Sequence, residues 1–229
     1  CYILPGQKPY CPKNYDGNFH GPVTLRAALG SSYNVPAVKT LSTFGVDKMI
    51  AKGQSMGITT WDDPSRFGLS LTLGGGEITM ANMGIKVNLH PILKVTDNKN
   101  KVLHEFNCCE SARVLNPLIA YQLTDILSDN SARTPAFGAN SLLNVSHHQV
   151  AVKTGTTQNL RDNWAIGYTT DFVALAWVGN NDNSSMSYVA SGITGATPIW
   201  RNIVDFMLKD KPEHRFSPPE NLIKVKVCT

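Results

Sequence analysis

The hydrophobic pattern predicts mainly helices in the first part of the chain and strands after about residue 147. Proline and glycine divide segment 22–45, which reads as a helix starting near Pro22, a short exposed turn and a second helix. We expect the other helices at 46–57, which glycine closes, and at 77–89, 116–129 and 197–210.

Two regions have the pattern of strands. Segment 91–107 reads as two short strands joined at a polar turn, 97–100. Three apolar or alternating runs follow residue 147, separated by short polar turns, and predict an antiparallel meander. In the last helix, Ile199, Ile203 and 206–208 lie on one side and are expected to cover a face of that sheet. The fold class is therefore α/β of the α+β type, an antiparallel sheet with helices packed on its faces.

Composition limits the function classes. The 229 residues, 42% of them apolar, can form one domain with a proper core. The net charge of +4 is small and the basic residues are scattered along the chain, so the sequence gives little support to nucleic-acid binding. No apolar run approaches the roughly 20 residues that cross a bilayer. The expected organisation is a loop or entry segment at 1–22, the domain at 23–210 and a C-terminal extension at 211–229.

The five cysteines do not settle the redox compartment. Their number is odd, Cys108 and Cys109 are adjacent, and no C-x-x-C pair occurs. His104 near them lacks the spacing of a zinc site. We interpret the cysteines as structural, and we expect no metal site.

Chemistry-bearing residues gather at the end of the first strand of the meander, in "KTGTT". Alternation places Val152 and Thr154 on one face and Lys153 on the other. Gly155 permits close approach of a ligand or another backbone. An ammonium, hydroxyls and amides together form a plausible anion pocket, although a polar turn after a strand would explain this stretch if it stood alone.

Serine acyl-transfer enzymes of the penicillin-recognising kind combine S-x-x-K, S-x-N and K-T-G. Two S-x-N triplets occur here. Ser128 to Asn130 lies at the end of an apolar helix, and helix termination explains it. Ser32 to Asn34 lies at the predicted turn between helices, far upstream of Lys153, and we assign the motif there.

The resemblance then extends well beyond two triplets. From about Lys13 to about Leu208, the chain resembles the transpeptidase domain of class A penicillin-binding proteins, with the motifs in family order. The stretches that carry it are "KNYDGNFHGPVTLRAALGSSYNVPAVKTL", "LTLGGGEITMANM", "VAVKTGTTQNLRDNWAIGYTTDFVALAWVGN" and "GATPIWRNIV". Within such a fold, the turn carrying Tyr33 is expected to face the edge of the sheet beside Gly155.

One large departure stands against this resemblance. No S-x-x-K motif occurs in the 229 residues. The most similar stretch, Thr96 to Lys99, has threonine in place of the nucleophilic serine and comes after the S-x-N motif in the chain. In the family the nucleophile helix precedes S-x-N. We therefore expect the chain to be the C-terminal part of a longer protein, with the nucleophile helix, a glycosyltransferase domain and a membrane anchor upstream, on the extracytoplasmic side of the membrane.

The resemblance implies a peptidoglycan D,D-transpeptidase that cross-links stem peptides and is acylated by β-lactams. It implies Ser32, Asn34 and Lys153 as catalytic residues. It implies substrate-binding or oxyanion roles for Thr154, Gly155, Thr156 and Thr157. The partners would be stem peptides ending in D-Ala-D-Ala, β-lactams and the N-terminal part of the same protein, without any cofactor.

Two alternatives remain open. One is a D,D-carboxypeptidase or β-lactamase, which shares the motifs but passes the acyl group to water. The other is a catalytically inactive binding or sensor module, which would apply if the gene has no S-x-x-K upstream. The chain by itself is expected to be inactive.

Overall fold

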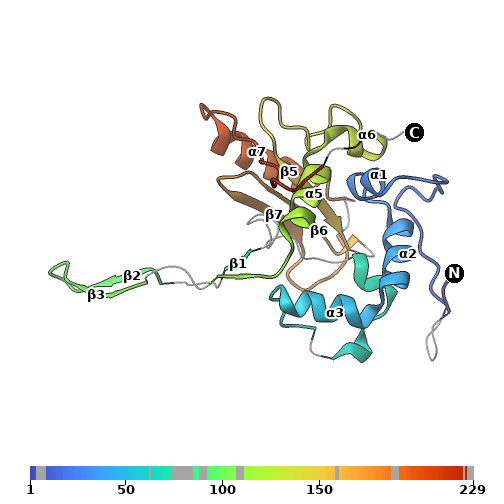
Figure 1. The fold of residues 1–229 in the computed structure, drawn as a ribbon, viewed down its shortest axis with the longest axis horizontal. Helices are drawn as coiled ribbons and strands as arrows, with labels where there is room; N and C mark the ends of the chain where they lie inside the picture. The colour runs from blue at the N-terminus through green and yellow to red at the C-terminus, as the bar shows by residue number, and fades with distance from the viewer. Residues whose placement is uncertain are drawn as a thin grey trace.

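The computed structural model describes residues 1–3, 9–61, 63–73, 85–87, 92–106, 111–157, 160–186, 191–223 and 225. Helices precede a three-stranded sheet, and one more helix follows it (Figure 1). In the described part of the chain, no helix combines the length and apolar character that crossing a bilayer requires. The α+β fold class predicted from the sequence is confirmed.

The central sheet is an antiparallel meander, as predicted. Its strands are β5 (Ala151–Thr156), β6 (Asp162–Tyr168) and β7 (Val173–Gly179), in the order β5-β6-β7. The register pairs Lys153 with Ile166 and Trp164 with Trp177. Since side chains alternate along each strand, the sheet has two faces of different composition.

The helix α7 (Ala196–Leu208) covers one face of the sheet. Trp200 and Val204 are fully buried there, against Val152, Ala165 and other small or branched residues. A Cβ on Gly167 would lie 2.5 Å from Trp200 Cζ2, so glycine is what lets the indole reach the sheet.

The side of α7 that packs on the sheet differs from the prediction. Ile199, Ile203, Phe206 and Met207 are exposed, and Leu208 alone of the predicted apolar set is buried. Trp200 and Val204 lie on the adjacent side of the same helix, in line with Leu208, and make the contact instead. The prediction was wrong because α7 is apolar on two sides, and helical periodicity does not say which side meets the sheet.

The opposite face of the sheet is only partly covered. The helix α5 (Pro117–Ser128) packs there through Tyr121 and Leu127 against Ala151 and Tyr168. The Thr124 and Tyr168 hydroxyls are 2.9 Å apart in the same contact. Farther along this face the apolar side chains are partly exposed: Trp164, Val173, Leu175 and Trp177.

The first two helices, α1 (Leu25–Gly30) and α2 (Asn34–Phe44), meet at a short turn, as predicted. Thr24, which the sequence predicts with Pro22 as a helix-start residue, caps α1 by accepting a hydrogen bond from the Ala27 amide. The third helix, α3 (Val46–Ser55), packs with α2 in a separate apolar cluster to which the 3₁₀ turn η2 (Leu69–Leu73) contributes. A shorter 3₁₀ turn, η1 (Pro64–Arg66), precedes η2 in the chain.

Asn116 caps α5 and Pro117 is its first residue, as the sequence predicts. The helix α6 (Asn130–Phe137), which was not predicted, follows at once. Asp129 caps it by accepting from the Ser131 amide. The Ser128 to Asn130 triplet therefore serves to end one helix and start the next, which confirms its interpretation as helix termination.

The predicted hairpin is present as β2 (Lys94–Thr96) and β3 (Val102–Glu105), and it projects from the body of the molecule (Figure 1). The predicted helix 77–89 is wrong at 85–87, because β1 (Ile85–Val87) pairs there with β4 (Ser111–Arg113). The alternation Ile-Lys-Val suits a strand as well as a helix end, and the long-range partner decides. Residues 77–84, 88 and 89 lie outside the described residues.

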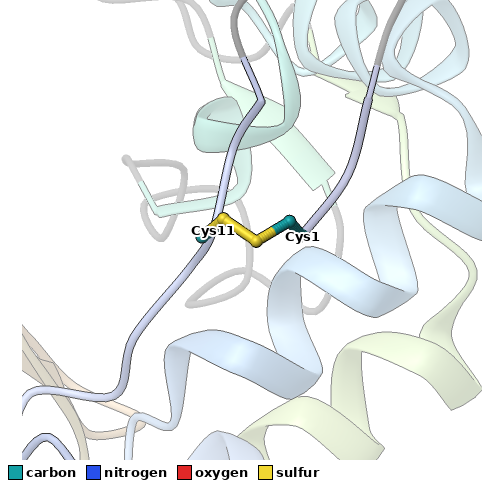
Figure 2. Close-up of a disulfide and its surroundings, with 2 residues drawn as sticks. All are labelled: Cys1 and Cys11. Carbon is teal, nitrogen blue, oxygen red and sulfur yellow. A yellow bond between two sulfur atoms is a disulfide. The ribbon is translucent and has the colours of Figure 1, made fainter.

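The N-terminal segment is closed by a disulfide between Cys1 and Cys11, which Figure 2 shows. Backbone hydrogen bonds between Tyr2 and Tyr10 run beside it. The sequence left the pairing open. Cys108, Cys109 and Cys228 lie outside the described residues.

Candidate active site

The turn between α1 and α2 lies against the strand β5. Lys153 Nζ donates a 2.6 Å hydrogen bond to Ser32 Oγ and a 2.7 Å hydrogen bond to its neighbour's carbonyl, Thr154 O. The expectation that the turn faces the sheet edge near Gly155 is therefore met. The structure thus brings together the Ser32 hydroxyl of the S-x-N motif and the Lys153 ammonium of the K-T-G motif.

The turn holds Ser32 in a backbone conformation that L residues seldom adopt. Its φ is 57°, in the left-handed region. The Ser32 amide donates to Leu29 O at 3.1 Å, and the Tyr33 amide donates to Ala28 O at 2.9 Å. The neighbouring Ser31 hydroxyl is buried and donates to Ala132 O at 3.0 Å. These contacts hold the turn to both α1 and α6.

Tight packing between α1 and α6 supports the same turn. A Cβ on Gly30 would lie 2.7 Å from the Ala132 Cβ. A side chain at this position would push α1, and with it Ser32, away from α6. Arg26 links α1 to the end of α5 by donating to Asp129 Oδ2 at 3.1 Å.

The strand β5 presents Lys153 at the edge of the sheet. Lys153 and Gly155 lie on the face away from α7, while Val152 contributes to the core beneath α7. A Cβ on Gly155 would lie 3.7 Å from the Trp164 Cβ, so this glycine leaves open space on that face rather than relieving a clash.

Thr154 and Thr156 point to the face opposite Lys153. Thr156 Oγ1 accepts a 2.9 Å hydrogen bond from the Gly192 amide. Because that bond uses only an acceptor site, the Thr156 hydroxyl can still donate its own proton. A Cβ on Gly192 would lie 3.0 Å from the Thr154 Cβ, so Gly192 packs closely on this part of β5.

Thr157 takes part in the turn between β5 and β6. Its hydroxyl accepts from the Asp162 amide at 3.0 Å and donates to Asp162 O at 3.2 Å. Among the site residues predicted from the sequence, Thr157 is thus the one whose hydroxyl is used in closing a turn. Its predicted contact with substrate stays a prediction.

Asn34 is the first residue of α2, and its Nδ2 donates to Lys13 O at 3.0 Å. A carboxamide has two N–H donors and one oxygen acceptor, so this bond leaves most of its capacity for a ligand. The site thus combines the Ser32 hydroxyl and the Lys153 ammonium at the edge of β5 with the Asn34 amide, two residues after Ser32. Such a set can move a proton and hold an anion.

Sequence reasoning missed the contribution of segment 13–21. Asn14 is buried, and its Oδ1 accepts from the Val35 amide at 3.1 Å. The His20 ring stacks on the Tyr33 ring with centroids 4.2 Å apart. A signal existed, because a helix that starts after Tyr33 has no local capping side chain and needs one from elsewhere.

Comparison with known proteins gives consistent relatives. Penicillin-binding protein 1A of Neisseria meningitidis is 30% identical over 96% of this chain and 29% of its own length. The crystal structure of penicillin-binding protein 1A from Haemophilus influenzae superimposes with a TM-score of 0.81 at 24% identity, covering 96% of this chain and 39% of that one. Penicillin-binding protein A of Mycobacterium tuberculosis, as its imipenem acyl-enzyme complex, matches with a TM-score of 0.66 at 20% identity, over 90% of this chain and 53% of that one. No family model matches.

The fold is that of the transpeptidase domains of penicillin-binding proteins. More particularly, the chain is similar to penicillin-binding protein 1A, a class A member, along nearly the whole length of the chain. The resemblance seen in the sequence is confirmed. The chain spans about three tenths of the length of the curated relatives that it matches.

Proposed function

We propose that this chain is part of a peptidoglycan D,D-transpeptidase that cross-links stem peptides by serine acyl transfer. The observation that carries the proposal is the hydrogen bond from Lys153 to Ser32, because it joins the S-x-N and K-T-G motifs at one edge of the sheet. The relationship to penicillin-binding protein 1A supports it.

In this proposal the nucleophilic serine belongs to a part of the protein outside the 229 residues, since the chain holds no S-x-x-K. That serine would attack the carbonyl between two terminal D-alanines and release the last one. An amine of a neighbouring stem would then take the acyl group. Ser32 would relay a proton toward the departing amine, because a hydroxyl both donates and accepts.

The other site residues predicted from the sequence would bind the donor peptide. Asn34 would hold a peptide amide, and the Lys153 ammonium would favour negative charge on the reacting oxygens. The Thr154 and Thr156 hydroxyls would bind the terminal carboxylate, with Gly155 allowing its approach. The Thr156 amide would form one half of the oxyanion hole, and Thr157 would border the cleft.

β-Lactams would react as substrate analogues at the same place, as imipenem does in penicillin-binding protein A of Mycobacterium tuberculosis. The complete protein would act on the extracytoplasmic face of the bacterial membrane, anchored by a segment outside this chain. Segment 23–210 would be the transpeptidase part, between an entry segment at 1–22 and an extension at 211–229.

The test is acylation by a fluorescent penicillin. The full-length gene product should be labelled, and the 229-residue chain alone should not, because losing the serine of a comparable acyl-transfer unit costs about 10⁶ in rate. Labelling of the chain alone would refute the assignment. An unlabelled full-length protein whose gene has no S-x-x-K would favour the inactive sensor module. Rapid release of the label in water would favour a carboxypeptidase or β-lactamase.

A further inference from the structure

The helix α2 begins without a capping side chain of its own. Its N-cap residue is Tyr33, which makes no side-chain cap hydrogen bond. The first amides of a helix have no partner inside the helix, so they need one from outside. This matters because the same turn carries Ser32, one residue before the cap.

Asn14 supplies the cap from a distant part of the sequence. Its Oδ1 accepts a 3.1 Å hydrogen bond from the amide of Val35, the second residue of α2. Its Nδ2 donates to Asn18 O at 2.7 Å, which fixes the side chain within its own loop. Asn14 is only 7% exposed, so water does not readily replace these bonds.

Two more contacts from the same loop reach the turn. The His20 ring lies parallel to the Tyr33 ring, with an interplanar angle of 13°, and His20 Nε2 is 2.9 Å from Asp16 Oδ2. Asn34 Nδ2 donates to Lys13 O at 3.0 Å. Each residue after Ser32 in the motif is therefore held by segment 13–21, and Ser32 itself has a φ of 57° that its surroundings must maintain.

We propose that Asn14 is a positioning residue that holds Ser32 in line with Lys153 by capping α2 from the preceding loop. The proposal rests on the acyl-transfer function proposed above. Losing the cap lets the first turn of α2 relax, and the Ser32 backbone leaves its unusual conformation. The hydroxyl then moves away from Lys153 Nζ, from which it lies 2.6 Å in this structure.

The test measures the second-order rate of acylation of the full-length protein by a fluorescent penicillin. Asn14→Leu keeps the approximate size of the side chain and removes the cap, and it should lower the rate about 10- to 100-fold, as a small misplacement of a reacting group does. Asn14→Asp keeps an acceptor for the Val35 amide but loses the donor to Asn18 O, so it should recover part of the rate that Asn14→Leu loses. If Asn14→Leu does not fold, Asn14→Ala is used in its place, because it removes the same polar atoms.

Asn116 offers a matched control. Its Oδ1 caps α5 by accepting from the Leu118 amide at 2.9 Å, so Asn116→Leu removes the same kind of bond from a helix that does not carry Ser32. The melting temperature should fall for both variants. The acylation rate should fall only for Asn14→Leu. In proteins that also carry Ser32→Ala, Asn14→Leu and Asn116→Leu should have the same acylation rate.

Equal acylation rates for Asn14→Leu and Asn116→Leu would overturn the inference. It would also be overturned if Asn14→Leu lowered the rate as much in a Ser32→Ala protein as in the unmutated one. Failure of the proposed function looks different, because the unmutated full-length protein would then not be labelled at all. A labelled protein that loses rate with Ser32→Ala but not with Asn14→Leu would contradict the positioning role alone.

Discussion

Lys153 and Ser32 are 121 residues apart in the sequence and 2.6 Å apart between Nζ and Oγ. An ammonium at this distance favours negative charge on the hydroxyl oxygen, and the hydroxyl keeps its proton available for transfer. The two side chains form a unit only because the α1–α2 turn and the edge strand β5 are held against each other.

The pair should behave as one catalytic unit. In the full-length protein, Ser32→Ala and Lys153→Ala should each lower the rate of penicillin acylation by about 10²- to 10⁴-fold, the usual contribution of proton transfer. The double variant should be little slower than the slower single variant, because both changes break one proton path. Lys39→Ala, on the exposed surface of α2, is the control and should react at the unmutated rate. Additive losses would argue against the pairing.

Gly192→Ala should damage the site without touching Lys153. The new Cβ would lie 3.0 Å from the Thr154 Cβ and from Trp164 O, and 3.1 Å from Gly155 O, so either the sheet or the segment that carries Gly192 must give by a few tenths of an ångström. We expect a loss of about 1–3 kcal/mol in the free energy of unfolding, typical of overpacking, together with slower acylation. Urea denaturation and penicillin labelling measure the two effects. Ser191→Ala, the neighbouring change, removes a hydroxyl 3.2 Å from Thr194 Oγ1 but adds no atom near β5, so it should affect stability and labelling far less. An unaffected Gly192→Ala protein would contradict the close approach.

Gly167→Ala should destabilise the contact between the sheet and α7. Its Cβ would lie 2.5 Å from Trp200 Cζ2 and 3.0 Å from Ala151 O. The expected cost is about 1–3 kcal/mol of unfolding free energy. Trp200→Phe removes the clashing atoms, so the double variant should lose less than the sum of the single losses. If chemical denaturation shows that the two losses of unfolding free energy simply add, the indole is not what the new Cβ clashes with.

We expect the positively charged side chain of Arg133 to stabilise the fold. It is buried, donates to Leu127 O and Leu143 O, and burial lowers its pKa to about 10. Arg133→Met leaves both carbonyls without this donor and should cost about 1.5–3 kcal/mol, the range for hydrogen bonds to charged groups.

Arg133→Lys keeps the charge and one donor and should lose less. Thermal denaturation at neutral pH compares the two variants, since Arg133 is protonated there in both the folded and the unfolded protein. A methionine variant as stable as the unmutated protein would show that the guanidinium contributes nothing net.

Local signals were sufficient for most elements. Asn116 and Pro117 mark the start of α5, and the alternating runs after residue 147 correspond to β5, β6 and β7. These signals act within a few residues, so they can be read without knowing the fold. The helix α6 escaped prediction because Asp129 is both the end of α5 and the cap of the next helix.

The errors have a common physical cause. Ile85–Val87 forms a strand because β4 lies beside it, and α7 packs through Trp200 because Gly167 leaves room for the indole. Neither partner is close in sequence. Asn14 was missed for the same reason, since its role appears only when it meets Val35.

The sequence by itself determined the residue types of the candidate site, the alternation that separates Lys153 from Thr154, and the family to which the motifs are similar. Only the tertiary structure decided that the Lys153 ammonium meets the Ser32 hydroxyl, which side of α7 is buried, and which side chain caps α2. Periodicity and capping are local, whereas these contacts join segments far apart in the chain. Packing of the whole molecule selects among the partners that local structure permits.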